Sequence, residues 1–304
     1  MPLPERTADD PSTVSGLLHF DPAEVRGKFD REPFRIAHRL SDHPLLQLPR
    51  IVELARSLPE SSVEYNSGDL QIGQDPLSTP RTGLGVEETL RRIEECQSWM
   101  VLKFIESDPE YRQLLDACLD QIQPAIEPVR PGMHRRRAFI FVSSPGATTP
   151  FHADFEHNFL LQIRGEKFMH VWDGGDPAVM DEVQRERVVC GGQRNLPYRD
   201  ELASKAWRFI LNPGDGLQVP FSSPHWVRVG SQVSVSLSIT FTSRHGSRLR
   251  ALHETNATLR GRGYAPRPVG QSALLDTLKF GAYRVATRLQ RLRAGGRDQE
   301  PDRY

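Results

Sequence analysis

The chain has few cysteines and no long apolar run, and both absences limit what it can be. Its three cysteines among 304 residues, Cys96, Cys118 and Cys190, are odd in number and widely spaced. They match no zinc-binding spacing and no disulfide framework, which favours a reducing compartment. No uncharged apolar stretch approaches the roughly 18 residues that a membrane-spanning helix needs, so no transmembrane segment is expected.

The sequence also lacks a recognisable secretory signal and an overall excess of charge of one sign. Residues 1–10 mix acids, Arg and Pro without an apolar core, so we expect no secretory signal and a cytoplasmic location. Lys and Arg number 39, as do Asp and Glu, but residues 244–304 hold 13 basic and 5 acidic side chains, a net +8. This basic tail is either a solvated face or a contact for an anionic partner.

What is present is an ordinary globular composition, with 38% hydrophobic and 26% charged residues. Residues 1–18 suggest a loose arm, and 66–84 a loop rich in Gly, Pro, Ser and Thr. Helices are expected at 45–58, 86–97 and, most clearly, 107–122. In that last segment Ser107 is the candidate N-cap, Glu110 follows three residues later, and apolar residues recur at helical spacing.

From about residue 137 to 242 the pattern changes to short strands separated by Gly- and Pro-containing turns. Strands are expected at 99–105, 137–143, 148–154, 158–163, 166–172, 207–211, 217–220 and 233–242. The last one alternates strictly between apolar residues and small hydroxyl residues, and a face of small hydroxyls leaves room for a cavity. Many short strands with such turns predict a mainly β sandwich or barrel with helical additions.

The sequence after residue 244 is expected to be irregular as far as about 272 and then helical. In that helix apolar residues follow a 3-4-3-4-3 spacing at Leu275, Leu278, Ala282, Val285, Leu289 and Leu292. Such a stripe suits packing against another helix, within the chain or in a homodimer. The basic residues between its members also suit an anionic membrane surface. We expect packing rather than membrane binding.

The most informative pair of side chains lies in segment 148–154. His152 and Asp154 are two residues apart on an expected strand, so both project from one face and offer a nitrogen and an oxygen to a metal ion. His225, after the Pro-Gly-Asp turn at 213–215, is the candidate third ligand. Two histidines and one carboxylate form a facial triad that leaves positions open on a non-haem Fe(II). Alone, a His-x-Asp pair is more often structural.

Residues 152–167, HADFEHNFLLQIRGEK, resemble the core of the JmjC/cupin-like Fe(II)- and 2-oxoglutarate-dependent oxygenases, and most strongly the hypoxia-inducible-factor asparaginyl hydroxylase branch. That branch has His-x-Asp, an Asn, and then Gln-Ile-x-Gly-x-Lys with the Lys thirteen residues after the Asp, and Asp154 and Lys167 keep this spacing. A Pro-Gly-Asp turn, a Pro and a metal-binding His five residues later also recur, ending at Pro220 and His225. The resemblance covers about residues 137–242.

The resemblance implies a double-stranded β-helix, or cupin-like jelly roll, with additions on both sides. The expected divisions are a loose arm at 1–18, a part with helices and strands at 19–136, the core at 137–244 and a helical extension at 245–304. It also implies that His152, Asp154 and His225 bind Fe(II). The implied reaction uses O2 and converts 2-oxoglutarate to succinate and CO2 while a substrate C–H bond is hydroxylated.

Further residues match positions that hold the cosubstrate in the family. Lys167 would pair with the distal carboxylate of 2-oxoglutarate, Thr149 would offer a hydroxyl to the same group, and Asn158 would hydrogen-bond in that pocket. A second Asn of the branch is not kept, and Ser238 stands near its place. From the residues alone, Lys167 either lies on an inner apolar face, where it needs an anion, or points to solvent.

Four functions are compatible with these features. The first is hydroxylation of a protein or peptide side chain, with loops 66–84 and 173–203 forming a substrate groove. The second is the same chemistry on a small molecule such as an amino acid, a natural product or a lipid-linked sugar, and either reaction becomes a demethylation when the carbon belongs to an N-methyl group. RNA modification is less favoured because few aromatic residues accompany the basic ones. A non-catalytic cupin-like binding module is disfavoured by the retention of the whole residue set.

Overall fold

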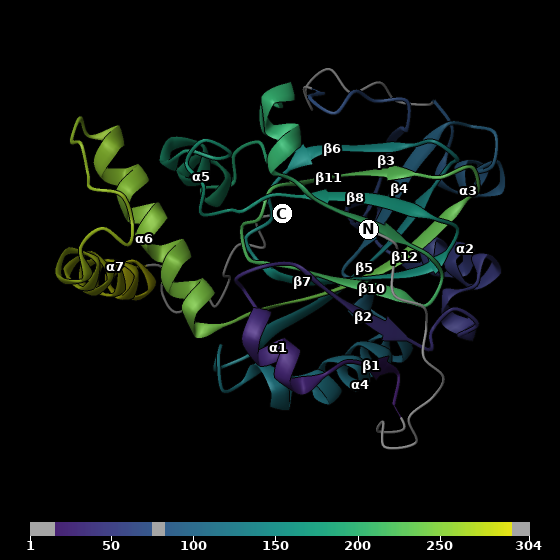
Figure 1. The fold of residues 1–304 in the computed structure, drawn as a ribbon, viewed down its shortest axis with the longest axis horizontal. Helices are drawn as coiled ribbons and strands as arrows, with labels where there is room; N and C mark the ends of the chain where they lie inside the picture. Colours follow the sequence, from purple (N-terminus) through teal and green to yellow (C-terminus); the bar gives the residue numbers. More distant parts are fainter. Residues whose placement is uncertain (1–15, 75–82, 294–304) are drawn as a thin grey trace.

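The computed structural model describes residues 16–74 and 83–293, and within them two antiparallel sheets form the body of the protein (Figure 1). The larger sheet has the strand order β1 (Leu18–His19), β2 (Phe34–His38), β10 (Asp215–Val219), β7 (His157–Arg164), β12 (Ser234–Thr242), β5 (His134–Ser143), β4 (Ser98–Lys103) and β3 (Val63–Ser67). The smaller sheet has the order β6 (Thr148–His152), β11 (His225–Val229), β8 (Lys167–Val171) and β9 (Trp207–Leu211). The mainly β, jelly-roll fold class is confirmed.

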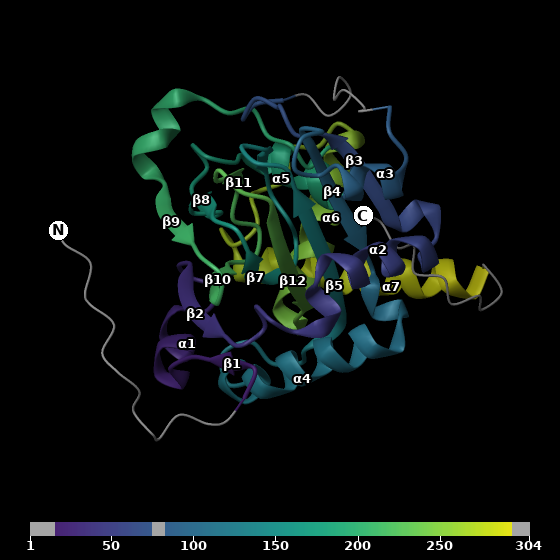
Figure 2. The same ribbon diagram turned by 90° about the vertical axis from the view of Figure 1, so that its right-hand side faces the viewer.

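Helices cover the outer side of the larger sheet and gather at one end of the molecule. They are α1 (Pro22–Lys28), α2 (Leu48–Ser57), α3 (Val86–Arg91), α4 (Pro109–Ile126), α5 (Glu182–Val189), α6 (Arg244–Gly261) and α7 (Ala273–Arg293). Figure 2 shows α1 and α4 on the side of the larger sheet that faces away from β8 and β11. Helices α5, α6 and α7 lie together beside the sheets, with α6 packed against both of the others (Figure 1).

The best-predicted helix is present, but it begins differently. The backbone N–H of Glu110 donates to the Asp108 side chain at 2.9 Å, so Asp108 and not Ser107 is the N-cap. Pro109 takes the first helical position, where no N–H is needed. The helix also runs past its expected end to Ile126. The expected helix at 86–97 is shorter and ends at Arg91.

The prediction that the chain is irregular from 244 to 272 was wrong, because residues 244–261 form α6. The backbone N–H of Gly246 donates to the Ser243 hydroxyl at 3.1 Å, which caps the helix. Its buried residues, such as Leu252, His253 and Asn256, mix apolar and polar types. This helix therefore lacks the apolar stripe by which sequence periodicity is recognised.

The two faces of β12 have different surroundings, as its alternation predicts. Val235, Leu237 and Ile239 belong to the core between the larger sheet and its covering helices. The hydroxyl face turns toward the space between the sheets, where Ser238 lines a cavity. Beyond β5, strands β4 and β3 extend the larger sheet and provide a further wall of the same cavity.

The expected arm at 1–18 lies, except for residues 16–18, outside the described residues, as do part of loop 66–84 and the end of the basic tail. Cys96, Cys118 and Cys190 form no disulfide with one another. None of the helices within residues 16–74 and 83–293 combines the length and apolar character that crossing a membrane would require.

Candidate metal centre

His152, Asp154 and His225 converge at one end of the smaller sheet. His152 is the last residue of β6 and His225 the first of β11, and strand pairing places them directly opposite each other. The chain leaves β6 after His152, and Asp154 Oδ2 lies 3.6 Å from His152 Nε2 and 3.9 Å from His225 Nε2. One ligand atom from each residue lies within 4.8 Å of the others. The expected triad is thus assembled, although Asp154 follows the strand instead of lying on it.

Backbone carbonyls fix the orientation of both imidazoles. His152 Nδ1 lies 2.7 Å from the Pro150 carbonyl oxygen, and His225 Nδ1 lies 3.0 Å from the Ser223 carbonyl oxygen. A carbonyl only accepts a hydrogen bond, so each Nδ1 carries the proton and each Nε2 keeps a lone pair. Both lone pairs are therefore available on the side where Asp154 lies. This second layer of hydrogen bonds is typical of metal-binding histidines.

The charges around the triad favour the forms that bind metal ions. Burial alone would raise the pKa of Asp154, but Arg194 and both histidines outweigh it and hold that pKa well below its usual range. Burial, and after it the neighbouring His152, lower the pKa of His225 to about 4. The carboxylate is therefore ionised and this imidazole neutral at pH 7. An N2O donor set of this kind suits divalent iron, so the residues fit the ion that the sequence resemblance implies.

A cavity of about 590 Å³ opens beside the triad, between the two sheets. It is lined by residues of the triad, of β3, β4 and β5, and of the loops on either side, among them His152, Asp154, Thr149, Asn158, Ser238, Asn66, Trp99, Lys103, Phe141, Arg194 and Asn195. Three of the four residues expected to hold a cosubstrate, Thr149, Asn158 and Ser238, are in its wall. The Ser238 hydroxyl donates to Asn158 Oδ1 at 2.8 Å, so the Asn158 amide keeps its NH2 group for another acceptor.

Lys167 begins β8 and points inward, with only 4% of its surface exposed. No carboxylate pairs with its ammonium in the described part of the chain. Its nitrogen instead lies 5.5 Å from the centre of the Phe141 ring, which lines the cavity. Burial lowers the pKa of Lys167 to about 7. Of the two orientations that the sequence left open, the structure shows the inner one, and a buried ammonium there needs an anion.

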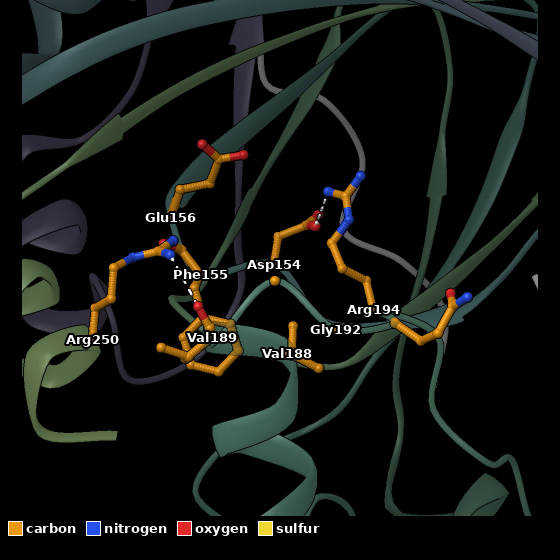
Figure 3. A pocket seen from close by; sticks show the side chains of 10 residues that line it. Asp154, Phe155, Glu156, Val188, Val189, Gly192, Arg194 and Arg250 are labelled. Carbon is orange, nitrogen blue, oxygen red and sulfur yellow. Dashed lines mark hydrogen bonds and ion pairs between the residues drawn. The ribbon is translucent and has the colours of Figure 1, made fainter. Parts of the chain in front are cut away.

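Arg194 is a site residue that the sequence reasoning missed. Its Nη1 donates to Asp154 Oδ1 at 2.8 Å, and both residues line a second cavity, of about 450 Å³, as well as the first (Figure 3 shows the second). The second cavity also has Glu156, Phe155, Val189 and Arg250 in its wall. No periodicity or motif marks Arg194, since it lies in the long irregular connection between α5 and β9.

No protein-family model and no curated protein matches the chain. Among solved structures it is similar to Escherichia coli YcfD, with 14% identity over 90% of this chain and 69% of YcfD and a TM-score of 0.49. A structure of YcfD described as a ribosomal oxygenase in complex with cobalt and 2-oxoglutarate is similar at 14% identity over 88% of this chain and 66% of that chain, with a TM-score of 0.46. Bacillus subtilis oxalate decarboxylase is similar at 21% identity over 35% of this chain and 21% of its own, with a TM-score of 0.24. These similarities are too distant to assign an activity.

Proposed function

We propose that the protein is an Fe(II)- and 2-oxoglutarate-dependent oxygenase that hydroxylates a C–H bond of a protein or peptide side chain. The observation that carries this proposal is that the His-Asp-His triad and a buried ammonium lie in the same protein interior. An N2O triad with both Nε2 lone pairs available lies at a cavity between the sheets. The buried ammonium of Lys167, which has no carboxylate partner among the described residues, lies 5.5 Å from the ring centre of Phe141 in the cavity wall. A triad alone serves many metal proteins, but the added cation calls for a ligand with a distant negative charge.

His152, Asp154 and His225 would hold Fe(II) through one atom each and leave its remaining positions open. With 2-oxoglutarate and O2, such a centre supplies the oxidant for C–H hydroxylation, and succinate and CO2 are released. The chain's own contribution is to orient the bound groups relative to the substrate C–H bond and to exclude water. The Nδ1–H groups of both histidines are held by carbonyls, so the imidazoles do not need to reorganise when the metal binds.

Lys167 would hold the distal carboxylate of the cosubstrate, and Thr149 would donate its hydroxyl to the same group. Thr149 precedes His152 by three residues on β6, roughly 10 Å at about 3.3 Å per residue, so the strand leads from the metal ligand toward the anion site. The free NH2 of Asn158, held by Ser238, would donate to an oxygen nearer the metal. Ser238, which stands near the place of the second Asn of the hydroxylase branch, would thus act on the cosubstrate only indirectly, by orienting Asn158.

The segments that line the cavity favour a large substrate, such as a peptide, that inserts one side chain into the cavity. Asn66 and Leu70 come from β3 and the residues that follow it, and Arg194 and Asn195 come from the connection after α5. Both segments lie at the chain positions expected to form a groove. A cavity of about 590 Å³ also suits a free small molecule, since ligand pockets commonly span about 300–1,000 Å³. Hydroxylation of a small molecule is therefore the second candidate.

The first test is anaerobic absorption spectroscopy of the purified protein with Fe(II) and then 2-oxoglutarate. We expect a visible metal-to-ligand charge-transfer band on addition of 2-oxoglutarate. The band should be lost in His152→Ala and should need more 2-oxoglutarate in Lys167→Ala. His134→Ala and Lys205→Ala, both at exposed positions, serve as controls. A folded, iron-loaded protein without the band would rule out the oxygenase and favour a binding module.

The second test separates the two substrate classes. The protein is incubated with Fe(II), 2-oxoglutarate and either a peptide library or a metabolite mixture, and succinate formation is measured in each. We expect peptides to stimulate turnover and to gain the mass of one oxygen atom. Stimulation by metabolites alone would identify the small-molecule reaction.

We further propose that α7 mediates a homodimer. Its stripe has exposed members in this chain, with Leu278 61%, Val285 60% and Leu292 71% exposed, while the opposite side packs on α6. A second copy would cover these apolar residues at heptad spacing. The double substitution Leu278→Glu/Val285→Glu should lower the sedimenting mass to that of one chain, whereas Gln290→Glu, at an exposed position outside the stripe, should not. An unchanged mass in the double variant would contradict the dimer.

A further inference from the structure

The two oxygen atoms of Asp154 have different neighbours. Oδ2 faces the metal-binding histidines, 3.6 Å and 3.9 Å from their Nε2 atoms. Oδ1 accepts a hydrogen bond from Arg194 Nη1 at 2.8 Å. A carboxylate oxygen in a charge-assisted bond of this length is occupied, and the guanidinium holds the carboxylate in one rotation about its axis. Only one oxygen of Asp154 is therefore presented to a metal ion.

We infer that Arg194 is a positioning residue that keeps Asp154 a one-oxygen ligand and so preserves an open position on the metal. The inference rests on the proposed function. A carboxylate with both oxygens free binds metal ions through one or both of them. On a six-coordinate ion, three protein atoms and the two donor atoms of 2-oxoglutarate leave one position. A second oxygen from Asp154 would fill it, although 2-oxoglutarate would still bind.

The backbone around Arg194 is anchored to the strand that carries His152. The Ala153 N–H donates to the Arg194 carbonyl at 3.3 Å, and the Leu196 N–H donates to the Phe151 carbonyl at 2.8 Å. An isolated bridge joins His152 to Asn195 between these two bonds. The segment 194–196 therefore lies beside the end of β6 as a short extra strand. Because the metal ligands and Arg194 are mounted on the same local frame, the ion pair keeps its geometry.

Contacts of the neighbouring residues also hold the backbone of Arg194 in position. The Asn195 side chain donates to the Gln74 carbonyl at 3.0 Å, which ties the segment to the opposite loop. On the other side, Gly192 ends the turn after α5, where an added Cβ would lie 2.7 Å from the Arg187 carbonyl oxygen. The Arg194 side chain lines both cavities and is 40% exposed.

The test uses nitric oxide as a probe of the last open position. Wild-type protein, Arg194→Ala, Arg194→Lys and the control Arg199→Ala are loaded anaerobically with Fe(II) and 2-oxoglutarate and titrated with nitric oxide, followed by electron paramagnetic resonance. Arg199 lies in the same connection and donates to the Ala178 carbonyl, away from the triad. Affinities for Fe(II) and for 2-oxoglutarate are measured on the same samples.

We expect Arg194→Ala to keep its Fe(II) affinity and to bind 2-oxoglutarate within about threefold of wild type, but to lose about tenfold or more in nitric oxide affinity, because the second Asp154 oxygen would compete for the open position. Arg194→Lys retains a donor to Oδ1 and should recover much of this loss. Loss of the positive charge by itself would strengthen nitric oxide binding, because it makes the iron more electron-rich. The expected change therefore has the opposite sign to a purely electrostatic one.

Two outcomes would overturn the inference. Unchanged or stronger nitric oxide binding in Arg194→Ala would show that Asp154 keeps one-oxygen binding unaided. A parallel loss of Fe(II), 2-oxoglutarate and nitric oxide would show that Arg194 only supports the local structure. If wild-type protein binds Fe(II) but no 2-oxoglutarate, the proposed function itself fails. If wild type binds it and only the nitric oxide result differs from expectation, the role of Arg194 alone fails.

Discussion

Lys167 is buried without an anionic partner in the described structure, so ligand-free protein bears the cost of burying its charge. Burial lowers the pKa of Lys167 to about 7, well below that of lysine in an unfolded chain. Between these two values the unfolded chain binds more protons than the folded one, so this residue makes stability rise with pH above about 7. If Lys167 binds an anion as we propose, the site is preorganised for that anion at the expense of the stability of the empty fold.

Replacing Lys167 by Met should therefore stabilise the ligand-free protein while weakening 2-oxoglutarate binding. One pKa unit corresponds to about 1.4 kcal/mol, so we expect a gain of at least about 1 kcal/mol in unfolding free energy at pH 7. Thermal or denaturant unfolding measures the gain, and calorimetric titration measures the binding. Lys205→Met, at an exposed lysine, is the control. A variant less stable than wild type would mean that Lys167 is paired in solution.

The same ammonium predicts a pH dependence of cosubstrate binding. Because the pKa of Lys167 is lowered to about 7 in the ligand-free protein, the ammonium loses its proton above that pH, while the carboxylates of 2-oxoglutarate stay ionised. The affinity should fall as pH rises above about 7, by up to about tenfold per pH unit. Lys167→Arg keeps its charge and should give a flat profile over this range. Equal slopes for the two proteins would contradict the prediction.

Among single residues, the sequence predicts those that stand at the spacing of a known motif. His152 and Asp154 are two residues apart and His225 follows a recognisable turn, so the triad can be proposed from this spacing together with the family resemblance, although Asp154 lies just after the strand on which it was expected. Arg194 cannot be found in this way, because its contact with Asp154 depends on how the irregular connection after α5 pairs with the end of β6. The roles of the triad in binding iron and of the nearby residues in binding the cosubstrate are still predictions.

Among the elements, α6 joins the jelly roll to the C-terminal part and is fixed to α5 by a buried charge. Arg260 donates to both oxygens of Glu186, at 2.9 Å and 3.1 Å, and the Glu186 side chain is only 3% exposed. A two-point contact of this kind orients as well as attracts. Helix α5 in turn precedes the segment that carries Arg194, so this ion pair supports the site from a distance.

Arg260→Ala should leave the Glu186 carboxylate buried without its main partner and destabilise the protein. Removing one member of a buried pair costs about 3–5 kcal/mol, and we expect about 2 kcal/mol here because the guanidinium is one-third exposed. The matched control is Arg56→Ala, which breaks an exposed ion pair with Glu87 and should not shift the melting temperature measurably. Equal shifts in the two variants would show that the Arg260 contact is no stronger than a surface pair.

Elements were predictable where one signal dominated. Helix α4 has a continuous apolar stripe and β12 a strict alternation, and both were recognised from the sequence. Helix α6 has neither, because it packs on α5 and α7 with a mixture of apolar and polar side chains. The capping residue of α4 was misplaced by one because Ser107 and Asp108 are both good caps, and only the fold decides between them.

For the molecule as a whole, Asp30 connects four distant segments. Its carboxylate lies 2.6 Å from Arg130 Nε, in the turn after α4, and 3.3 Å from His157 Nδ1 at the start of β7. It also accepts the backbone N–H of Phe221, in the turn that leads to His225, at 3.0 Å. Burial alone would raise the pKa of Asp30, but His157 and Arg130 outweigh it and lower that pKa below its usual range.

Asp30→Asn should lower the unfolding free energy by about 3 kcal/mol, since it leaves the Arg130 guanidinium facing a neutral amide. A carboxylate with a lowered pKa contributes stability above its unfolded value, near 4, and loses it as the pH falls below that value. The difference between wild type and variant should therefore shrink below about pH 4. Denaturant unfolding at several pH values tests both statements. Asp120→Asn, at an exposed ion pair, should change little, and a pH-independent difference in Asp30→Asn would contradict the charge argument.

The order of strands in the larger sheet has a consequence for how the chain folds as it is made. Strand β2 pairs with β10, and β12, the last strand in the sequence, lies between β7 and β5. Until residue 242 has been synthesised, β5 and β7 therefore present unpaired edges toward each other, and such edges invite aggregation. Contacts between segments so far apart also slow folding. An elongating chain should thus depend on holding factors until its central strand is inserted.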